Sequence, residues 1–214
     1  MRVAIAGGHG KIALRLARLL TEDDHEVRAL IRNADHSADV RKTGAEPVVV
    51  DLEEADEVET AKAVEGMDAI VFAAGAGPGS GPERKWTVDY GAAAKLIAAA
   101  LVAKISRYVI VSSQGADPNA EGDDAFTVYL QAKGRADEEL QASGLEYTIV
   151  RPTHLTDEPP VGTVEIAEQV ERGDVSRDDV AAVLHKALLE PQTIGKTFAV
   201  GPGDVPIAEA VALI

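Results

Sequence analysis

The chain has 214 residues, with 36 acidic side chains against 21 basic ones and a formal net charge of −15 at pH 7. This length suits one domain with a full core, and so acidic a surface repels phosphates, which disfavours nucleic acid and anionic membranes as partners. The chain contains no cysteine, which excludes disulfides, thiolate metal sites and a cysteine nucleophile.

The amino-terminal segment predicts a strand, a glycine-rich turn and a helix. An apolar run over residues 3–6 leads into Gly7-Gly8-His9-Gly10, and an amphipathic pattern follows over residues 11–20. Gly7 permits a tight turn, Gly10 lets backbone N–H groups approach phosphate oxygens, and the small Ala13 lets the helix pack close to the strand. This order indicates a dinucleotide-binding turn, while a plain strand-to-helix turn is the alternative.

Apolar strand patterns alternate with helical patterns along the first three quarters of the chain. Strands are predicted at residues 3–6, 27–31, 47–50, 69–72, 108–111 and 147–150. Helices are predicted near residues 11–20, 35–43, 55–64, 87–103 and 127–142. Each strand is almost continuously apolar, as in parallel sheets covered on both faces. The alternation therefore predicts an α/β fold with a doubly wound parallel sheet in the order 3-2-1-4-5-6.

The remaining residues form a short carboxyl-terminal tail. The pattern predicts a strand at 164–167, a helix over 176–189 capped by Ser176, a strand at 196–200 and a helix from 207. The tail is too short for a separate substrate domain. We therefore expect one domain over residues 1–214, with a cofactor-binding core at 1–152 and a tail at 153–214 that packs on the sheet and shapes the substrate pocket.

The end of the second strand predicts which dinucleotide is bound. NAD sites usually place a carboxylate there, whereas an arginine accommodates the 2′-phosphate of NADP. Here the strand ends in Arg32, and no carboxylate follows until Asp35. The sequence therefore favours NADP over NAD, and a solvated arginine at the start of a loop is the alternative.

Further candidate cofactor contacts follow the third and fourth strands. Asp51 and Leu52 come after the third strand, in the loop that lies along the adenine in this architecture. Small residues after the fourth strand would let a dinucleotide lie flat across the sheet edge; they are Ala73, Ala74 and Gly75. The glycine-rich segment 75–82 is either a flap over the cofactor or a surface loop.

A candidate catalytic group lies on the helix predicted after the fifth strand. Tyr129 and Lys133 are four residues apart and share one helical face. A lysine ammonium favours the phenolate form of a nearby tyrosine, which can then exchange a proton with a carbonyl oxygen. Ser112 and Ser113 end the fifth strand, and the hydroxyl of Ser113 could orient the substrate. Tyr-x-x-x-Lys also arises by chance, with a half-buried tyrosine beside a solvated lysine. The catalytic interpretation is favoured because the pair falls in the helix after the fifth strand of a dinucleotide-binding fold.

Taken together, these motifs resemble the short-chain dehydrogenase/reductase superfamily. The chain is most similar to its atypical NAD(P)H-binding group, which has NmrA-like and flavin/biliverdin-reductase-like members. The resemblance rests on Gly7-Gly8-His9-Gly10-Lys11-Ile12-Ala13, Arg32, Asp51-Leu52, Phe72-Ala73-Ala74-Gly75, Val88-Asp89-Tyr90, Val111-Ser112-Ser113, Tyr129 with Lys133, and Ser143-Gly144-Leu145-Glu146-Tyr147-Thr148-Ile149-Val150-Arg151-Pro152. It covers residues 1 to about 160.

The resemblance implies a Rossmann-type fold and assigns roles in the site. Lys133 would hydrogen-bond the nicotinamide ribose, and Pro152 and Thr153 would lie beside the nicotinamide. His9 either touches a phosphate or faces solvent. The residues expected to contact the cofactor are Gly7, His9, Gly10, Lys11, Ile12, Arg32, Asp51, Leu52, Ala73, Ala74, Gly75, Ser112, Lys133, Pro152 and Thr153.

Three functions are compatible with these residues. The first is an NADPH-dependent oxidoreductase that transfers hydride to a small carbonyl, a flavin or a similar conjugated acceptor, with Tyr129 as acid, Lys133 as its electrostatic partner and Ser113 as orienter. The second is a non-catalytic NADP(H)-binding redox sensor of the NmrA-like type. The third is a nucleotide-sugar epimerase, which the short tail disfavours.

The remaining expectations concern metals, partners and location. The five histidines are not at metal-ligand spacing, so no metal site is expected. A small-molecule substrate, a monomer or weak homo-oligomer, and no nucleic acid or membrane partner are expected. No apolar run reaches the roughly 18 residues of a membrane span, and the chain starts directly with a strand pattern, so a cytoplasmic location is expected.

Overall fold

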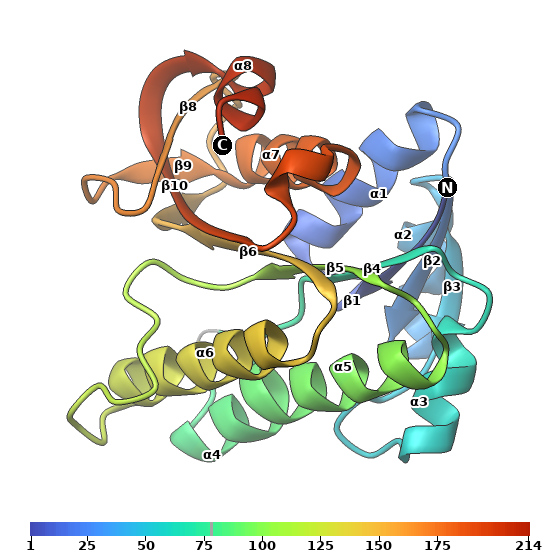
Figure 1. The fold of residues 1–214 in the computed structure, drawn as a ribbon. Coiled ribbons are helices and arrows are strands. Elements are labelled where there is room, and N and C mark those ends of the chain that lie inside the picture. The colour runs from blue at the N-terminus through green and yellow to red at the C-terminus, as the bar shows by residue number, and fades with distance from the viewer. Residues whose placement is uncertain (78) are drawn as a thin grey trace.

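The computed structural model describes residues 1–77 and 79–214, and it contains an eight-stranded sheet with helices on both faces (Figure 1). Pro78, within the glycine-rich segment 75–82, lies outside the described residues. The strands of this sheet are β1 (Arg2–Ala6), β2 (Glu26–Ile31), β3 (Glu46–Val49), β4 (Ala69–Phe72), β5 (Arg107–Val111), β6 (Glu146–Pro152), β8 (Thr163–Ala167) and β10 (Lys196–Pro206). Two short strands, β7 (His154–Thr156) and β9 (Asp174–Ser176), pair separately.

The sheet order is β3-β2-β1-β4-β5-β6-β10-β8, which confirms the predicted doubly wound order 3-2-1-4-5-6. The first six strands pair in parallel. The tail extends the same sheet, because β10 pairs in parallel with β6 and in antiparallel with β8. β10 is longer than the predicted strand at 196–200, and its register with β8 shifts between Gly201 and Val205.

The helices follow the predicted alternation with two differences. They are α1 (Lys11–Glu22), η1 (Ala34–His36), α2 (Ser37–Arg41), α3 (Glu57–Val64), α4 (Pro82–Arg84), η2 (Lys85–Ala92), α5 (Ala93–Val102), α6 (Ala125–Ala142), α7 (Arg177–Leu189), η3 (Pro191–Thr193) and α8 (Ile207–Ala212). The predicted helix at 35–43 is a 3₁₀ turn followed by a short α-helix. The predicted helix at 87–103 starts earlier, and its first part, η2, is a π-helix. π-Helical segments are rare and frequently lie at functional sites.

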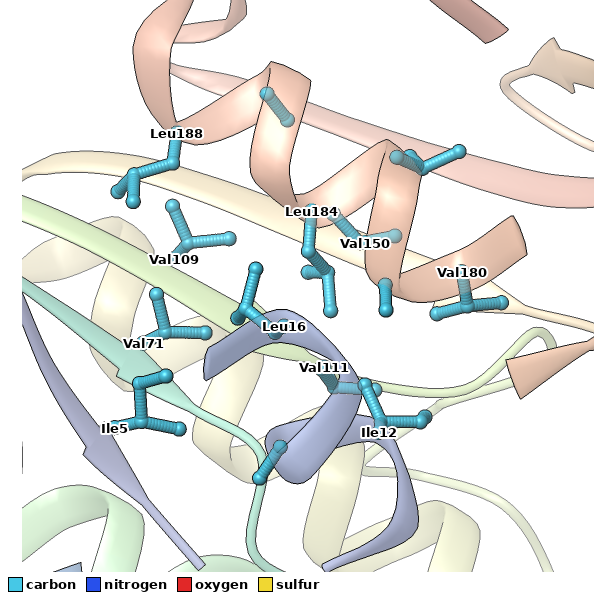
Figure 2. Close-up of a cluster of buried hydrophobic side chains, with 14 of the residues drawn as sticks. Ile5, Ile12, Leu16, Val71, Val109, Val111, Val150, Val180, Leu184 and Leu188 are labelled. Atoms are coloured by element: carbon cyan, nitrogen blue, oxygen red, sulfur yellow. The ribbon is translucent and has the colours of Figure 1, made fainter. Parts of the chain in front are cut away.

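Alternate strand residues face two separate hydrophobic cores. In β1, Val3 and Ile5 belong to the core beneath α1 and α7, whereas Ala4 and Ala6 belong to the core covered by α3, α5 and α6. Figure 1 shows these two helical layers on opposite faces of the sheet. Figure 2 shows the first core, where Leu16 of α1 and Leu184 of α7 come together over the strands. Burial on both faces explains why the central strands are almost continuously apolar.

The turn after β1 approaches the end of β4 closely. Gly7 has a φ of +74°, and a Cβ there would lie 2.6 Å from the Cα of Ala74. Only glycine therefore fits both the conformation and the contact. The close approach brings the carboxyl ends of β1 and β4 together, which is where ligands bind in sheets of this type. None of the helices in the described part of the chain is long and apolar enough to cross a membrane.

Candidate functional site

Two cavities adjoin at the carboxyl ends of the parallel strands, and they share Ala73, Ala74 and Gly75 after β4. The first cavity has a volume of about 320 Å³ and is lined by Gly7, Gly8, His9, Gly10, Leu30, Ile31, Arg32, His36, Val50, Asp51, Leu52, Glu53, Ala73, Ala74, Gly75, Ala76, Arg84, Val88 and Ala92. The second has a volume of about 460 Å³ and is lined by Ile12, Ala73, Ala74, Gly75, Gly77, Gly79, Ser80, Lys85, Asp89, Val111, Ser112, Ala125, Phe126, Tyr129, Lys133 and Leu155. An elongated ligand could therefore run across the sheet edge from one cavity into the other.

The glycine turn opens the amino end of α1 toward a ligand. Gly10 precedes the helix in an extended conformation, and no side chain within the described residues caps it. The first amides of a helix, here from Lys11 onward, have no partner within the helix and carry partial positive charge. Together with the absent Cβ of Gly7, they leave room and donors for a diphosphate, so the turn fits the pyrophosphate of a dinucleotide.

Two arginines surround one carboxylate at the far end of the first cavity. Arg84 Nη2 lies 2.6 Å from Glu53 Oε2, and Arg32 Nη1 lies 3.6 Å from the same oxygen. The hydrogen bond from Arg84 holds the pKa of Glu53 below its usual value, and a hydrogen bond from Thr87 at 2.7 Å adds to it. The guanidinium of Arg32 remains more than half exposed, so it stays accessible to an anion.

His9 lies in the first cavity but is already engaged. Its ring stacks on that of His36, with centroids 3.8 Å apart, and its Nε2 lies 3.2 Å from Asp39 Oδ2. Hydrogen bonds from Lys42 and then from His9 lower the pKa of Asp39. The structure thus places His9 at the wall of the first cavity, against the segment that follows β2, and its contact with a phosphate stays a prediction.

The predicted tyrosine and lysine both line the second cavity. Lys133 is buried, and its Nζ lies 3.3 Å from Asp89 Oδ1, donates to the carbonyl oxygen of Val111 at 3.0 Å and lies 6.0 Å from the centre of the Tyr129 ring. Burial, the largest single effect, lowers the pKa of Lys133, but the negative charges of Asp89, Tyr129 and Asp137 together outweigh it, and the pKa lies above its ordinary value. Lys133 therefore keeps its charge beside Tyr129.

The two serines after β5 have different surroundings. Ser112 lines the second cavity and donates to Asp137 Oδ2 at 2.7 Å, an oxygen that also accepts from Arg151 Nε at 2.9 Å. Burial raises the pKa of Asp137 in spite of these contacts. Ser113 donates to the carbonyl oxygen of Gln114 at 3.3 Å and is not among the residues lining either cavity. Its predicted role as substrate orienter stays a prediction.

Three predicted cofactor residues have side chains outside the two linings. Lys11 Nζ pairs with Asp157 of the tail. Pro152 ends β6, and Thr153 follows it, with its backbone N–H donating to the carbonyl oxygen of Val200 at 2.9 Å. Lys11 can therefore contribute through its backbone amide, while the predicted nicotinamide contacts of Pro152 and Thr153 stay predictions.

Sequence reasoning missed several lining residues. These residues are His36, Glu53, Arg84, Lys85, Phe126 and Leu155. Arg84 and Lys85 lie before the predicted helix at 87–103, at the end of α4 and the start of the π-helix η2. Asp89 was part of the recognised motif, but its contact with Lys133 was not predicted, because the two residues are 44 positions apart.

Comparison with known proteins shows the family to which this chain belongs. The model of a family described as NAD(P)H-binding matches residues 7–191. The "Uncharacterized sugar epimerase YhfK" of Bacillus subtilis (strain 168) is 42% identical over 212 residues, which cover 99% of each chain.

Two solved structures have the same fold over the whole chain. A "Putative NAD-dependent epimerase/dehydratase" from Bacillus halodurans superposes with a TM-score of 0.92 at 38% identity and full coverage of both chains. The oxidoreductase ylbE from Lactococcus lactis gives a TM-score of 0.87 at 28% identity, covering 100% of this chain and 96% of its own. The expected resemblance is confirmed, and the chain belongs to the NAD(P)H-binding family.

Proposed function

We propose that the protein is an NADP(H)-dependent oxidoreductase that transfers hydride between the cofactor and a small carbonyl, flavin or similar conjugated compound. One observation carries the proposal: the dinucleotide turn and the Tyr129–Lys133 pair line two cavities that share residues 73–75. A dinucleotide with its diphosphate at the turn would bring its nicotinamide to the second cavity, beside the phenol of Tyr129.

The first cavity supports a preference for NADP over NAD. Arg32 directly follows β2 with an accessible guanidinium, and Arg84 pairs with the same oxygen of Glu53 that Arg32 approaches. Planar guanidinium groups bind phosphate by paired hydrogen bonds, and Arg32 and Arg84 both line the first cavity. The adenosine 2′-phosphate would thus meet two guanidinium groups.

The substitution Arg32→Ala tests this preference. It should weaken NADPH binding by about tenfold or more, the loss expected for one charged hydrogen-bond partner, and leave NADH binding nearly unchanged. Isothermal calorimetry with both cofactors measures the two effects. Arg18→Ala, at an exposed position in the second half of α1, controls for the loss of one positive charge. Equal losses for the two cofactors would show that Arg32 does not contact the 2′-phosphate.

The second cavity supplies groups for proton transfer. The reduced nicotinamide supplies the hydride when it is bound. Tyr129 donates a proton to the oxygen that becomes negative on the acceptor, and the charge of Lys133 stabilises the phenolate that remains. Asp89 fixes the position of the ammonium at 3.3 Å, so the charge lies in place before the reaction begins.

The substitution Tyr129→Phe tests the chemistry. It should leave NADPH affinity nearly intact and lower turnover by about 10²-fold or more, since general acid catalysis contributes roughly this factor. Steady-state oxidation of NADPH, followed by absorbance with a panel of acceptors, gives the rates. Tyr147→Phe is a matched control, because Tyr147 lies near the amino end of β6, whereas the cavities lie at the carboxyl ends of the strands. Unchanged turnover in the Tyr129 variant would show that this tyrosine is not the acid.

Two other functions remain as outcomes of these experiments. The names of the B. subtilis and B. halodurans relatives favour an epimerase as the second candidate. An epimerase would interconvert nucleotide sugars without net consumption of the cofactor. If NADPH binds but neither an acceptor nor a nucleotide sugar is converted, the result favours the redox sensor of the NmrA-like type.

A further inference from the structure

A second lysine lies beside Tyr129 in the second cavity. Lys85 is the first residue of the π-helix η2, and its side chain is buried. Its Nζ donates to the carbonyl oxygen of Gly77 at 2.9 Å and lies 5.5 Å from the centre of the Tyr129 ring. The ammonium therefore lies at the wall of the cavity that holds the proposed reaction centre.

The two lysines of this cavity differ in their counter-charges. Lys133 is paired with Asp89 at 3.3 Å. Within residues 1–77 and 79–214, no carboxylate oxygen lies within 4.0 Å of the Lys85 ammonium, which donates instead to the neutral carbonyl of Gly77. A buried charge without a counter-charge is costly. The chain has 36 acidic residues, yet none of those described pairs with this ammonium at the cavity wall. An anionic group on the ligand would supply the missing counter-charge.

The rest of the lining is mainly apolar and partly aromatic. Phe126 is 63% exposed although it is a large hydrophobic residue, and its ring lies 6.1 Å from that of Tyr129 with a tilt of 30°. Ile12, Val111 and Leu155 line the same cavity. Exposed aromatic rings at a cavity wall favour a flat, apolar body that can stack on them.

We infer that the second cavity takes a flat acceptor that carries an acidic group, a carboxylate or a phosphate, and that Lys85 binds this group. The inference rests on the proposed function, because it names the substrate class of the same site. Lys85 is then a specificity-determining residue, which selects acidic over neutral acceptors by a charge-assisted hydrogen bond.

The substitution Lys85→Gln separates this role from a merely structural one. Glutamine keeps an N–H donor for the carbonyl oxygen of Gly77 and removes the charge. Lys62→Gln is the matched control, because Lys62 is exposed on α3 and its variant has the same net charge as the Lys85→Gln variant.

Two pairs of probes differ in the acidic group alone. FMN and riboflavin test a phosphate, and 4-carboxybenzaldehyde and 4-formylbenzamide test a carboxylate. Calorimetry with the NADP⁺-loaded protein gives the ratio of affinities within each pair, and NADPH oxidation gives the ratio of kcat/KM. For at least one pair, the wild type and the Lys62 variant should prefer the acidic member by about tenfold or more, and Lys85→Gln should abolish the preference.

The outcomes distinguish the two hypotheses. A preference in one pair identifies the acidic group as phosphate or carboxylate. No preference in either pair, or a preference that survives in Lys85→Gln, overturns the inference whether or not NADPH is oxidised. Binding preference without any NADPH oxidation supports the anion site and contradicts the proposed oxidoreductase.

Discussion

At the scale of single residues, Glu53 shows how a charge shapes the first cavity. Its carboxylate accepts from Arg84 at 2.6 Å and from Thr87 at 2.7 Å, and it is one-fifth exposed. It thereby holds the loop after β3 against the segment that begins with α4. Without this contact the two arginines would repel each other and spread apart.

Glu53 also makes stability depend on pH. Its folded-state pKa is depressed by the hydrogen bond from Arg84, so its contribution is present above the unfolded pKa of about 4.5 and is lost as the pH falls through the folded pKa. Glu53→Gln should therefore cost about 1 kcal/mol at neutral pH, with the difference from wild type narrowing below about pH 4.5.

Urea denaturation from neutral pH down to about pH 4 measures this difference, and the exposed neighbour substitution Glu54→Gln is the control. A destabilisation that stays constant over this range would show that the ionised carboxylate is not what stabilises the fold.

Residue spacing predicted part of the site and missed the rest. Tyr129 and Lys133 were found because four residues form one helical turn, and both line the second cavity. Spacing could not show that Asp89 holds the ammonium of Lys133, since that contact joins η2 to α6. Nor could it distinguish Ser112, which lines the cavity, from the adjacent Ser113.

At the scale of elements, the glycine turn was predictable and the segment 82–102 was not. Gly7 and Gly10 predict the turn, because few other residues fit its conformation and close contacts. The pattern predicts a helix over 87–103, but the earlier start at Pro82 and the change from α4 to the π-helix η2 and then to α5 leave no periodic signal in the sequence. Only the packing of η2 against α6 reveals which of its side chains reach the cavity.

The close packing at Gly134 is a second feature of an element that the sequence pattern did not predict. It lies inside α6, where glycine weakens a helix, and a Cβ there would lie 2.4 Å from the backbone nitrogen of Pro118. The turn at 117–118 thus packs directly on the helix backbone, which fixes the loop between β5 and α6 at the side of the second cavity.

At the scale of the whole molecule, the tail completes both the sheet and one core. β10 covers the edge of β6, and α7 packs against α1 over Val109, Val111 and Val150 (Figure 2). This arrangement supports the proposal of a single domain over residues 1–214, because the core beneath α1 and α7 is built from both ends of the chain.

A truncation after Pro152 tests this proposal. The chain 1–152 would expose the edge of β6 and the apolar face beneath α7, so it should aggregate or unfold without a cooperative transition. Size-exclusion chromatography and thermal denaturation followed by circular dichroism measure these properties. A monomeric fragment with a cooperative transition would show instead that residues 1–152 are a domain by themselves.

The sequence by itself determined the order of the parallel strands, the glycine turn after β1 and the placement of Tyr129 and Lys133 on one helical face. These features depend on local conformation, hydrophobic periodicity and spacing within one element, which neighbouring residues encode. Only the tertiary structure decided where the tail pairs, which carboxylate meets Lys133, and that Lys85 lies buried with no carboxylate beside it among the residues the structure describes. Those contacts join residues far apart in the chain, and packing rather than local preference brings them together.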